Sequence, residues 1–435
     1  MSRLTVSQGA AVSIGAVLGT GVISLPALGA QVAGPASLLA WIALIVLSIP
    51  LATTFAALGA RYPDAGGVST YVRRAFGGRA AAIVGWCFYF AVPVGAPAAG
   101  FMAGAYVSAA VGGGLRTTLL TTGALILVVT AMNAGGVRIS GRVQLGLAVL
   151  LVTLLLAATL TSLPHADLAN LTPFAPHGWA AIAPAAAVLV WGFAGWEAVT
   201  SLAADFRRPA RDVPRATAIA IVVVSVLYLA VAAASLLVLG PATATTEAPL
   251  AELLAIGVGG EVRVLTAVAA LLLTLGAMNA YFAGSAKLGA ALARDGALPA
   301  WLARGSSAGE VPRRSLAVIA TLSAASLVAA GAFGVSTRSI VLLTTGSFVL
   351  VYVLGTAAAV KLLPRRSWSR RSAVVALASA LALLVMAGPY LLWPLGLAAV
   401  ALVYLAGRSW RSRRRPEPVL AAPFPIVEPG VCPRR

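Results

Sequence analysis

Residues 14–26 read IGAVLGTGVISLP, a stretch that is apolar enough to lie in a lipid bilayer. It nevertheless contains Gly15, Gly19 and Gly21, and it ends on Pro26. Each glycine in a helix interior costs about 1 kcal/mol relative to alanine, so the middle of this segment is easy to unwind. Free backbone groups at membrane depth are tolerated only where they line a cavity or meet a ligand. The alternative is a helix-packing face of the G-x-x-x-G kind, which Gly15 and Gly19 also fit, and this stretch alone leaves both interpretations open.

The chain as a whole has the composition of a membrane protein. Of its 435 residues, 60% are hydrophobic and 10% are charged, whereas soluble domains are about half apolar and a quarter charged. Long apolar runs separated by short polar ones predict a single polytopic bundle rather than several soluble domains. The first run begins close to Met1, lacks an A-x-A cleavage pattern at a suitable distance and is longer than a signal-peptide core, so we expect it to be retained.

Twelve apolar runs are long enough to cross a bilayer, which takes roughly 17 to 25 residues. Their approximate cores are 8–32, 36–60, 80–110, 115–133, 142–163, 179–204, 215–239, 262–291, 314–333, 338–362, 372–387 and 389–407. The sequence therefore predicts an all-α polytopic membrane protein with twelve transmembrane helices in one domain, residues 1–407. Residues 408–435 are rich in Arg and Pro without periodicity, and they predict a disordered basic cytoplasmic tail.

Basic residues are distributed unevenly between the two sides of this predicted bundle. The net charge is 31 minus 12, or +19, and with a cytoplasmic N-terminus 28 of the 31 Lys and Arg residues fall on the cytoplasmic side. Arg116, Arg263 and Arg338 fall on the other side. This positive-inside imbalance predicts a multi-pass protein of the plasma membrane with both termini in the cytoplasm. The basic excess is then topological, with some attraction to the anionic lipid of the bilayer, and we expect no nucleic-acid partner.

A second predicted span is interrupted in the same way as the first. Span six contains VLVWGFAGWEAVTSLAADF at 188–206, where Gly192 and Gly195 precede the acidic residue Glu197. Spans one and six are five apart, which is the offset expected when two five-helix repeats of inverted topology form one transporter, with a binding site at the midplane. Half-helix N-termini offer N–H donors to a carboxylate, and unwound carbonyls accept from an ammonium group. A zwitterionic amino acid satisfies both.

Three motifs also resemble one known family. They are GAVLGTGVISLP at 15–26, YPDAGGVSTYVRRAFG at 62–77, and FAGWEAVTSLAADFRRPARDVPRA at 193–216. Together they are similar to the amino acid, polyamine and organocation (APC) transporter superfamily. The PVGAPAA of 93–99 adds a likeness to bacterial exporters of methionine and branched-chain amino acids, and LARDGALP at 292–299 resembles the superfamily more loosely.

The resemblance implies an architecture of twelve helices with a five-plus-five inverted-repeat, LeuT-like core in which helices 1 and 6 are broken. The two repeats would cover about 8–163 and 179–362, and two extra helices would cover 372–407. One departure concerns span five, VQLGLAVLLVTLLLAATLTSL at 143–163. Some members of the superfamily place a lysine there as a built-in cation, and this sequence has none, which leaves the coupling ion open.

The resemblance also suggests which residues bind the substrate. Backbone N–H groups of Gly19, Thr20 and Gly21 would bind the carboxylate, while Phe193, Ala194 and Gly195 would line the α-amino and side-chain regions. Gly15 belongs to the same broken stretch and is a further candidate. Asn279 and Asn133 could line the cavity, although a polar interhelical hydrogen bond explains either residue equally well.

Glu197 is the one carboxylate placed inside a predicted span core. An intramembrane acid is by default a functional hypothesis, because burying its charge costs several kcal/mol or forces protonation. It is our candidate for coupling transport to protons. The alternative is a structural acid that hydrogen-bonds the loose backbone between Gly192 and Gly195.

The sequence contains no G-x-S-x-G elbow, no H-E-x-x-H and no Walker A motif, so we expect no enzyme, no cofactor, no metal site and no nucleotide-driven pump. The leading hypothesis is a secondary exporter of neutral hydrophobic amino acids, namely methionine, leucine, isoleucine or valine, by proton antiport. An uptake permease or exchanger on the same fold is the first alternative. An ion channel or a membrane receptor is the alternative of another class, and the oligomeric state is left open.

Overall fold

The computed structural model describes residues 4–19, 21–63, 67–136, 141–197, 200, 203, 206–259, 262–305 and 310–413. Within these ranges the regular elements are helices, and Leu4 and Phe206 form one isolated β-bridge. The helices follow the apolar runs of the sequence, because a chain in hydrocarbon must satisfy its backbone hydrogen bonds within its own segments. The expectation of an all-α protein is therefore met in the part of the chain that is described.

The α-helices, in chain order, are α1 (Val6–Leu18), α2 (Leu25–Ala33), α3 (Ser37–Arg61), α4 (Gly67–Phe76), α5 (Gly78–Val111), α6 (Gly114–Ala134), α7 (Gly141–Ser162), α8 (Ile182–Leu189), α10 (Pro209–Ala234), α11 (Pro249–Val258), α12 (Val262–Arg294), α13 (Arg313–Phe333), α14 (Thr337–Leu362), α15 (Trp368–Met386) and α16 (Leu392–Arg413). The short 3₁₀ segment η5 (Val190–Phe193) continues α8. Most boundaries lie within a few residues of the predicted cores.

Ten continuous helical stretches in the described residues are long and apolar enough to cross a membrane, whereas the sequence predicted twelve spans. The difference lies at the two predicted breaks. Span one is divided into α1 and α2, and the stretch Trp179–Phe193 is too short to be counted. The chain is thus a multi-pass membrane protein with at least ten apolar helices of spanning length.

The first break occurs where the sequence placed its glycines. Helix α1 ends at Leu18, and Gly19 has φ +29° and ψ −133°, outside the helical region that a residue with a Cβ prefers. Its N–H still bonds the carbonyl of Gly15 at 3.0 Å, and the described residues 21–24 then form turns. Helix α2 begins at Leu25 with Pro26 in its first turn, where a missing N–H costs nothing.

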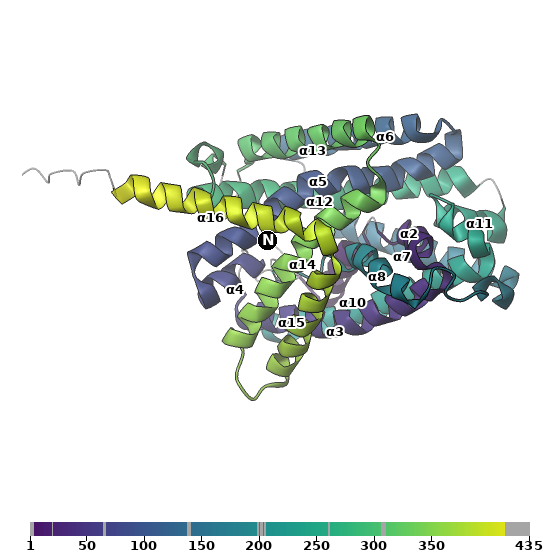
Figure 1. Ribbon diagram of the computed structural model, residues 1–435, viewed down its shortest axis with the longest axis horizontal. Helices are drawn as coiled ribbons and strands as arrows, with labels where there is room; N and C mark the ends of the chain where they lie inside the picture. Colours follow the sequence, from purple (N-terminus) through teal and green to yellow (C-terminus); the bar gives the residue numbers. More distant parts are fainter. Residues whose placement is uncertain are drawn as a thin grey trace, which may run out of the picture.

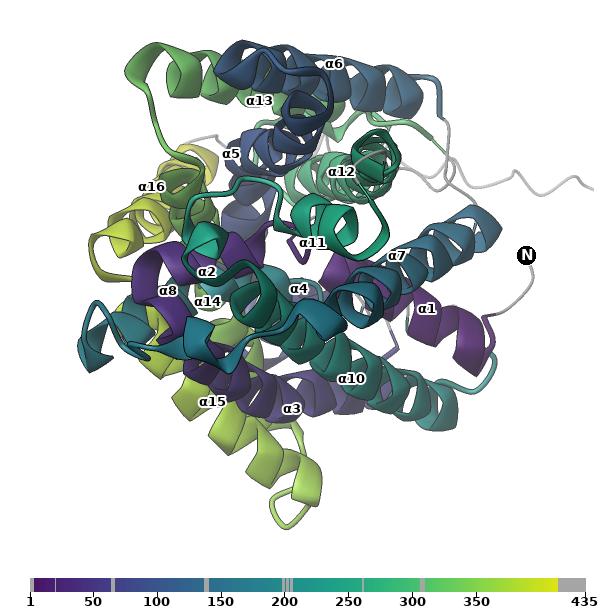
Figure 2. The same cartoon turned by 90° about the vertical axis from the view of Figure 1, so that its right-hand side faces the viewer.

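Helix α5 forms the centre of the bundle and packs against α6, α12 and α14. Helices α6 and α13 lie side by side along one edge, and α3 lies along the opposite edge with α10 and α15 as its neighbours (Figure 1). The two halves of the first span are separate helices in Figure 2, where α2 packs against α8 and α1 packs against α7 and α10. Helices α4 and α11 lie toward opposite ends of the bundle (Figure 1).

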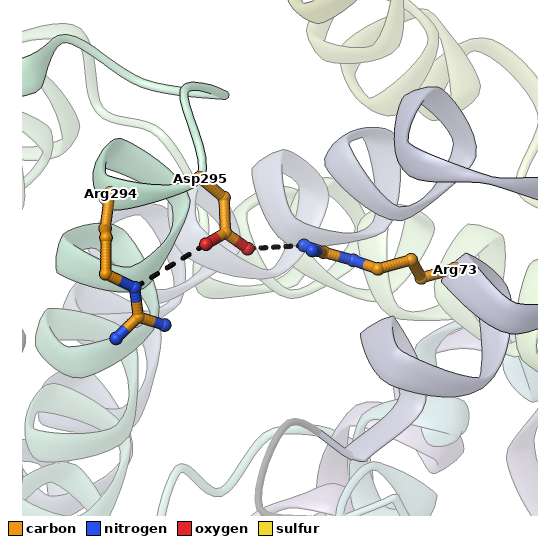
Figure 3. A network of polar contacts seen from close by, with 3 residues as sticks. All are labelled: Arg73, Arg294 and Asp295. Carbon is orange, nitrogen blue, oxygen red and sulfur yellow. Dashed lines mark hydrogen bonds and ion pairs between the residues drawn. The ribbon is translucent and has the colours of Figure 1, made fainter.

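Helix α4 is fastened to the core at two points. Arg73 of α4 forms an ion pair with Asp295 at 2.5 Å, and Arg294 approaches the other carboxylate oxygen of Asp295 at 3.6 Å (Figure 3). On the other side, Lys361 of α14 donates to the carbonyl of Ala75 at 2.6 Å, near the C-terminal end of α4. These contacts give a structural reason for charged residues at the end of α12 and in α4.

The last helix is longer than the sequence predicted. It continues past residue 407 to Arg413, and the Arg408 guanidinium donates to the carbonyl of Gly296 at 3.1 Å. This contact gives the helix a partner beyond the apolar run. Residues 414–435, which make up most of the predicted tail, lie outside the described part of the chain.

Candidate functional site

A cavity lies where the first break, α5, η5, α12 and α14 meet, and it encloses about 600 Å³ of open space including the part that opens to solvent. None of the described residues that line the cavity carries a charge. Tyr281 and Thr344 are the described lining residues with a side-chain hydroxyl. Charged groups of a ligand must therefore be met by uncharged partners, namely backbone groups and polar side chains such as these hydroxyls.

The first break contributes the glycines Gly19 and Gly21 to this cavity. The N–H of Gly19 bonds back to α1, whereas the N–H of Gly21 has no acceptor among the described residues. Gly21 also lies just before α2, whose N-terminal end carries partial positive charge. This arrangement offers a backbone donor and a favourable dipole to an anionic group.

Trp191 of η5 lies across the cavity between two glycines. A Cβ built at Gly21 would be 2.9 Å from the indole Cδ1 of Trp191, and one built at Gly95 of α5 would be 3.2 Å from its Cη2. A side chain at Gly21 would therefore clash with the indole in its present position, and one at Gly95 would crowd it. Trp191 and Gly95 were not predicted as site residues, although both lie within quoted motifs, because only glycines that interrupt a span indicate a binding site in the sequence.

The second break brings the chain into direct contact with the first. Ala194, which lines the cavity, has extended backbone, and Gly195 has φ +123°, a conformation that L-residues with a Cβ rarely adopt. A Cβ at Gly195 would lie 2.7 Å from the carbonyl oxygen of Ala16. Gly195 thus permits a close backbone crossing of the two broken segments and does not itself line the cavity.

Tyr228 of α10 holds the two broken segments together. Its hydroxyl donates to the carbonyl of Val17 at 2.9 Å and also lies against the carbonyl of Gly192, so one buried proton serves an acceptor from each break. Its ring packs against Phe193 and Trp41, with centroids 5.1 and 4.9 Å away. Phe193 is therefore part of an aromatic cluster behind the break, outside the cavity lining.

Glu197 follows the second break and is 5% exposed. Its Oε2 accepts the backbone N–H of Gly195 at 3.0 Å and the hydroxyl of Tyr352, on α14, at 2.7 Å. Tyr352 also reaches the carbonyl of Phe193 at 3.4 Å. The carboxylate therefore connects the break in span six to α14, one of the helices that line the cavity, without lining it.

The other predicted site residues lie elsewhere. A Cβ at Gly15 would meet the Cβ of Ala148 at 3.8 Å, so this glycine faces α7. Asn279 accepts the side-chain amide of Asn133 at 2.8 Å, which is the interhelical hydrogen bond that the sequence left as an alternative. Thr20 lies outside the described residues. The structure thus gathers Gly19, Gly21 and Ala194 at the cavity and places Gly15, Phe193, Gly195 and Asn279 around it.

Comparison with known proteins identifies the family. The amino acid permease family profile matches residues 4–426. YecA of Bacillus subtilis (strain 168), an uncharacterized amino acid permease, is 32% identical over 411 residues, which is 94% of this chain and 97% of that protein. YjeH of Escherichia coli (strain K12), an L-methionine/branched-chain amino acid exporter, is 32% identical over 414 residues, which is 93% of this chain and 94% of that protein.

A third relative is named a permease, whereas YjeH is named an exporter. The branched-chain amino acid permease BcaP of Bacillus subtilis (strain 168) is 26% identical over 239 residues, covering 51% of each chain. The family and its named members are transporters and not enzymes. The chain therefore belongs to the amino acid permease family of the APC superfamily and is an amino acid transporter of the membrane.

Proposed function

We propose that this protein is a secondary active exporter of neutral hydrophobic amino acids, namely methionine, leucine, isoleucine or valine, driven by proton antiport. The observation that carries the proposal is the uncharged cavity between two broken helices, with Gly19, Gly21 and Ala194 at its wall. An apolar cavity favours an apolar substrate side chain, because none of the described lining residues carries a charge that could neutralise a charged one. The exporter YjeH, 32% identical along almost the whole chain, supports this substrate class.

The substrate's two charges would be met by the ends of the broken helices. The N–H of Gly21, which has no acceptor among the residues that the structure describes, and the N-terminal end of α2 would bind the carboxylate. Carbonyl oxygens at the C-terminal end of α1, which carries partial negative charge, would accept from the ammonium group. Ala194 and Trp191 would then lie beside the Cα and side chain of the substrate. Gly15, Phe193, Gly195 and Asn279 would act indirectly, by holding the broken segments and their neighbours in place.

We also propose the arrangement of the whole chain in the membrane. The ten continuous helices and the two broken spans would give twelve transmembrane helices with a five-plus-five inverted repeat. Both termini would be cytoplasmic, because 28 of the 31 Lys and Arg residues then face that side. In this orientation α11 and the loop containing η2 (Leu163–His165) lie outside the cell.

Glu197 is the proposed coupling residue. It is buried within the second break, and its carboxylate bonds the Gly195 N–H and the Tyr352 hydroxyl. If the break rearranges during transport, these two donors move relative to the carboxylate and its preference for a proton changes. Proton binding and release would thereby follow the same motion that opens the cavity to each side.

An uptake permease or exchanger on the same fold is the second candidate, and the permease name of BcaP favours it. Flux into and out of proteoliposomes that contain the purified full-length chain separates the candidates. The proposal predicts saturable flux of labelled methionine or leucine, and accumulation against its gradient when protons are allowed to flow the other way. Flux without any response to an imposed pH gradient would support an exchanger, and unsaturable ion conductance without amino acid flux would indicate a channel.

A further inference from the structure

The wall of the cavity that α5 provides is made entirely of small residues. These residues are Ala91, Val92, Gly95, Ala96 and Ala99. The walls opposite are built from larger side chains, among them Met278 and Phe282 of α12 and Phe348 of α14. The cavity is therefore open on this side because the α5 residues that line it have small side chains. A larger side chain on this wall would reduce the space for a ligand.

Gly95 lies on this wall and faces side chains from two other elements. A Cβ built there would lie 2.9 Å from the Cγ2 of Thr344 and 3.2 Å from the Cη2 of Trp191, and both of these side chains line the cavity. The two neighbours come from different elements, α14 and η5. One added methyl group would therefore touch two walls at once.

The backbone at Gly95 does not itself require glycine. The residue lies inside α5 and is not among the glycines with positive φ, so an alanine could adopt the same conformation. Glycine in a helix interior is also less favourable than alanine by about a factor of five in equilibrium terms. The missing side chain, and not the backbone freedom, is what this position contributes to the structure.

We infer that Gly95, together with Thr344, sets the largest substrate side chain that the cavity accepts. This inference rests on the proposed function, since it concerns the same cavity, and it assigns the size limit to one pair of facing residues. Adding a methyl at Gly95 would exclude longer side chains and leave room for short ones. The discrimination that one methylene provides in an apolar pocket is about ten- to 200-fold, which is the range expected here.

The test compares Gly95→Ala with the wild type in proteoliposomes, using labelled alanine, valine, leucine, methionine and phenylalanine. We expect the transport efficiency for leucine and methionine to fall at least about tenfold relative to the smallest amino acid that the wild type carries. Gly284→Ala on α12 is the matched control, because a Cβ there meets nothing within 4 Å, and it should leave the ratio unchanged.

Thr344→Ser provides an independent variant, since it removes the Cγ2 nearest to Gly95 and keeps the hydroxyl that bonds the carbonyl of Ile340 at 2.9 Å. Alone, it should raise the efficiency for phenylalanine relative to leucine, and combined with Gly95→Ala it should restore leucine and methionine. An unchanged size profile in Thr344→Ser, or an equal loss of all substrates in Gly95→Ala that Thr344→Ser does not reverse, would overturn the inference. If the wild type carries none of these amino acids, the proposed function itself fails.

Discussion

Individual glycines in this chain have two different roles, lining the cavity or packing against a neighbouring helix, and the sequence alone does not distinguish these roles. Gly21 lines the cavity beside the indole of Trp191, and its N–H has no acceptor in the described part of the chain, whereas Gly15 faces α7 in ordinary helix packing. Both are glycines in one apolar stretch. What distinguishes them is which neighbour each one faces, and that depends on how the helix is rotated in the folded bundle.

Gly21→Ala should abolish transport while leaving folded protein in the membrane. The new Cβ would lie 2.9 Å from both the Cδ1 of Leu25 and the Cδ1 of Trp191, so the cavity wall beside the indole must rearrange. A displacement of about 1 Å at a binding site can reduce turnover by about a hundredfold. Labelled leucine counterflow measures the loss, and size-exclusion chromatography in detergent checks the fold.

Gly123→Ala is the control for this change, because its Cβ would make an ordinary contact of 3.7 Å with Leu327. It should transport as the wild type does. Normal counterflow by Gly21→Ala would instead favour a purely packing role for the glycines of the first break.

Glu197→Gln should separate exchange from proton-driven transport. Glutamine keeps a carbonyl oxygen to accept from Gly195 and Tyr352, so the contacts of 3.0 and 2.7 Å can persist, but it cannot ionise. Exchange needs the binding site and its motion, and we expect it to be retained. Accumulation driven by a pH gradient should be lost.

Counterflow and proton-driven flux are measured on the same proteoliposomes, so that protein content cancels from the comparison. Equal effects of Glu197→Gln on the two activities would remove this residue from the coupling mechanism and leave it as a structural acid of the break.

At the scale of the helices, the sequence predicted most of the fold. Apolar run length is a direct physical requirement of the bilayer, so the predicted cores match elements such as α6 and α13 to within a residue or two. The breaks were also predicted, because clustered glycines weaken a helix wherever they occur. The composition of the cavity could not be predicted in the same way. Phe193 and Asn279 face neighbouring helices, and their orientation depends on packing between distant parts of the chain.

Tyr106 of α5 links the first break to α11. Its hydroxyl donates to the carbonyl of Ile23 at 2.5 Å and accepts the N–H of Leu250 at 3.2 Å. Leu250 lies in the first turn of α11, where the N–H groups have no partner within the helix, and Ala248 provides no side-chain cap. The buried Tyr106 hydroxyl thus provides a hydrogen-bond partner both for the N–H of Leu250 in α11 and for the carbonyl of Ile23 in the break.

Tyr106→Phe should lower thermal stability in detergent, because both backbone groups lose their partner at a cost of about 1–3 kcal/mol each when buried. Transport should fall as well, since the break loses a contact that fixes its shape. The unfolding midpoint by differential scanning fluorimetry reports the first effect. Tyr404→Phe is the matched control, because the Tyr404 hydroxyl makes no hydrogen bond within the described residues, and a similar midpoint for both variants would contradict the proposed link.

At the scale of the whole molecule, the distribution of charge predicts the orientation. The loop with η2 contacts α11. Arg208 immediately precedes the N-terminus of α10, and the 26 residues of α10 make this helix about 39 Å long. In a background without Cys87 and Cys432, a cysteine at Pro164 should react with an impermeant maleimide added outside intact cells, and one at Arg208 should not. Labelling of Arg208→Cys alone would reverse the proposed orientation.

The central claim is that an amino acid binds between the two broken helices through both of its charged groups. Equilibrium competition against labelled leucine tests this directly, using leucinol, which lacks the carboxylate, and 4-methylpentanoate, which lacks the ammonium group. Hydrogen bonds to charged groups contribute about 1.5–3 kcal/mol, so each analogue should bind at least about tenfold more weakly than leucine. Competition by either analogue as strong as that by leucine itself would contradict the account, because the corresponding end of the broken helices would then play no part in binding.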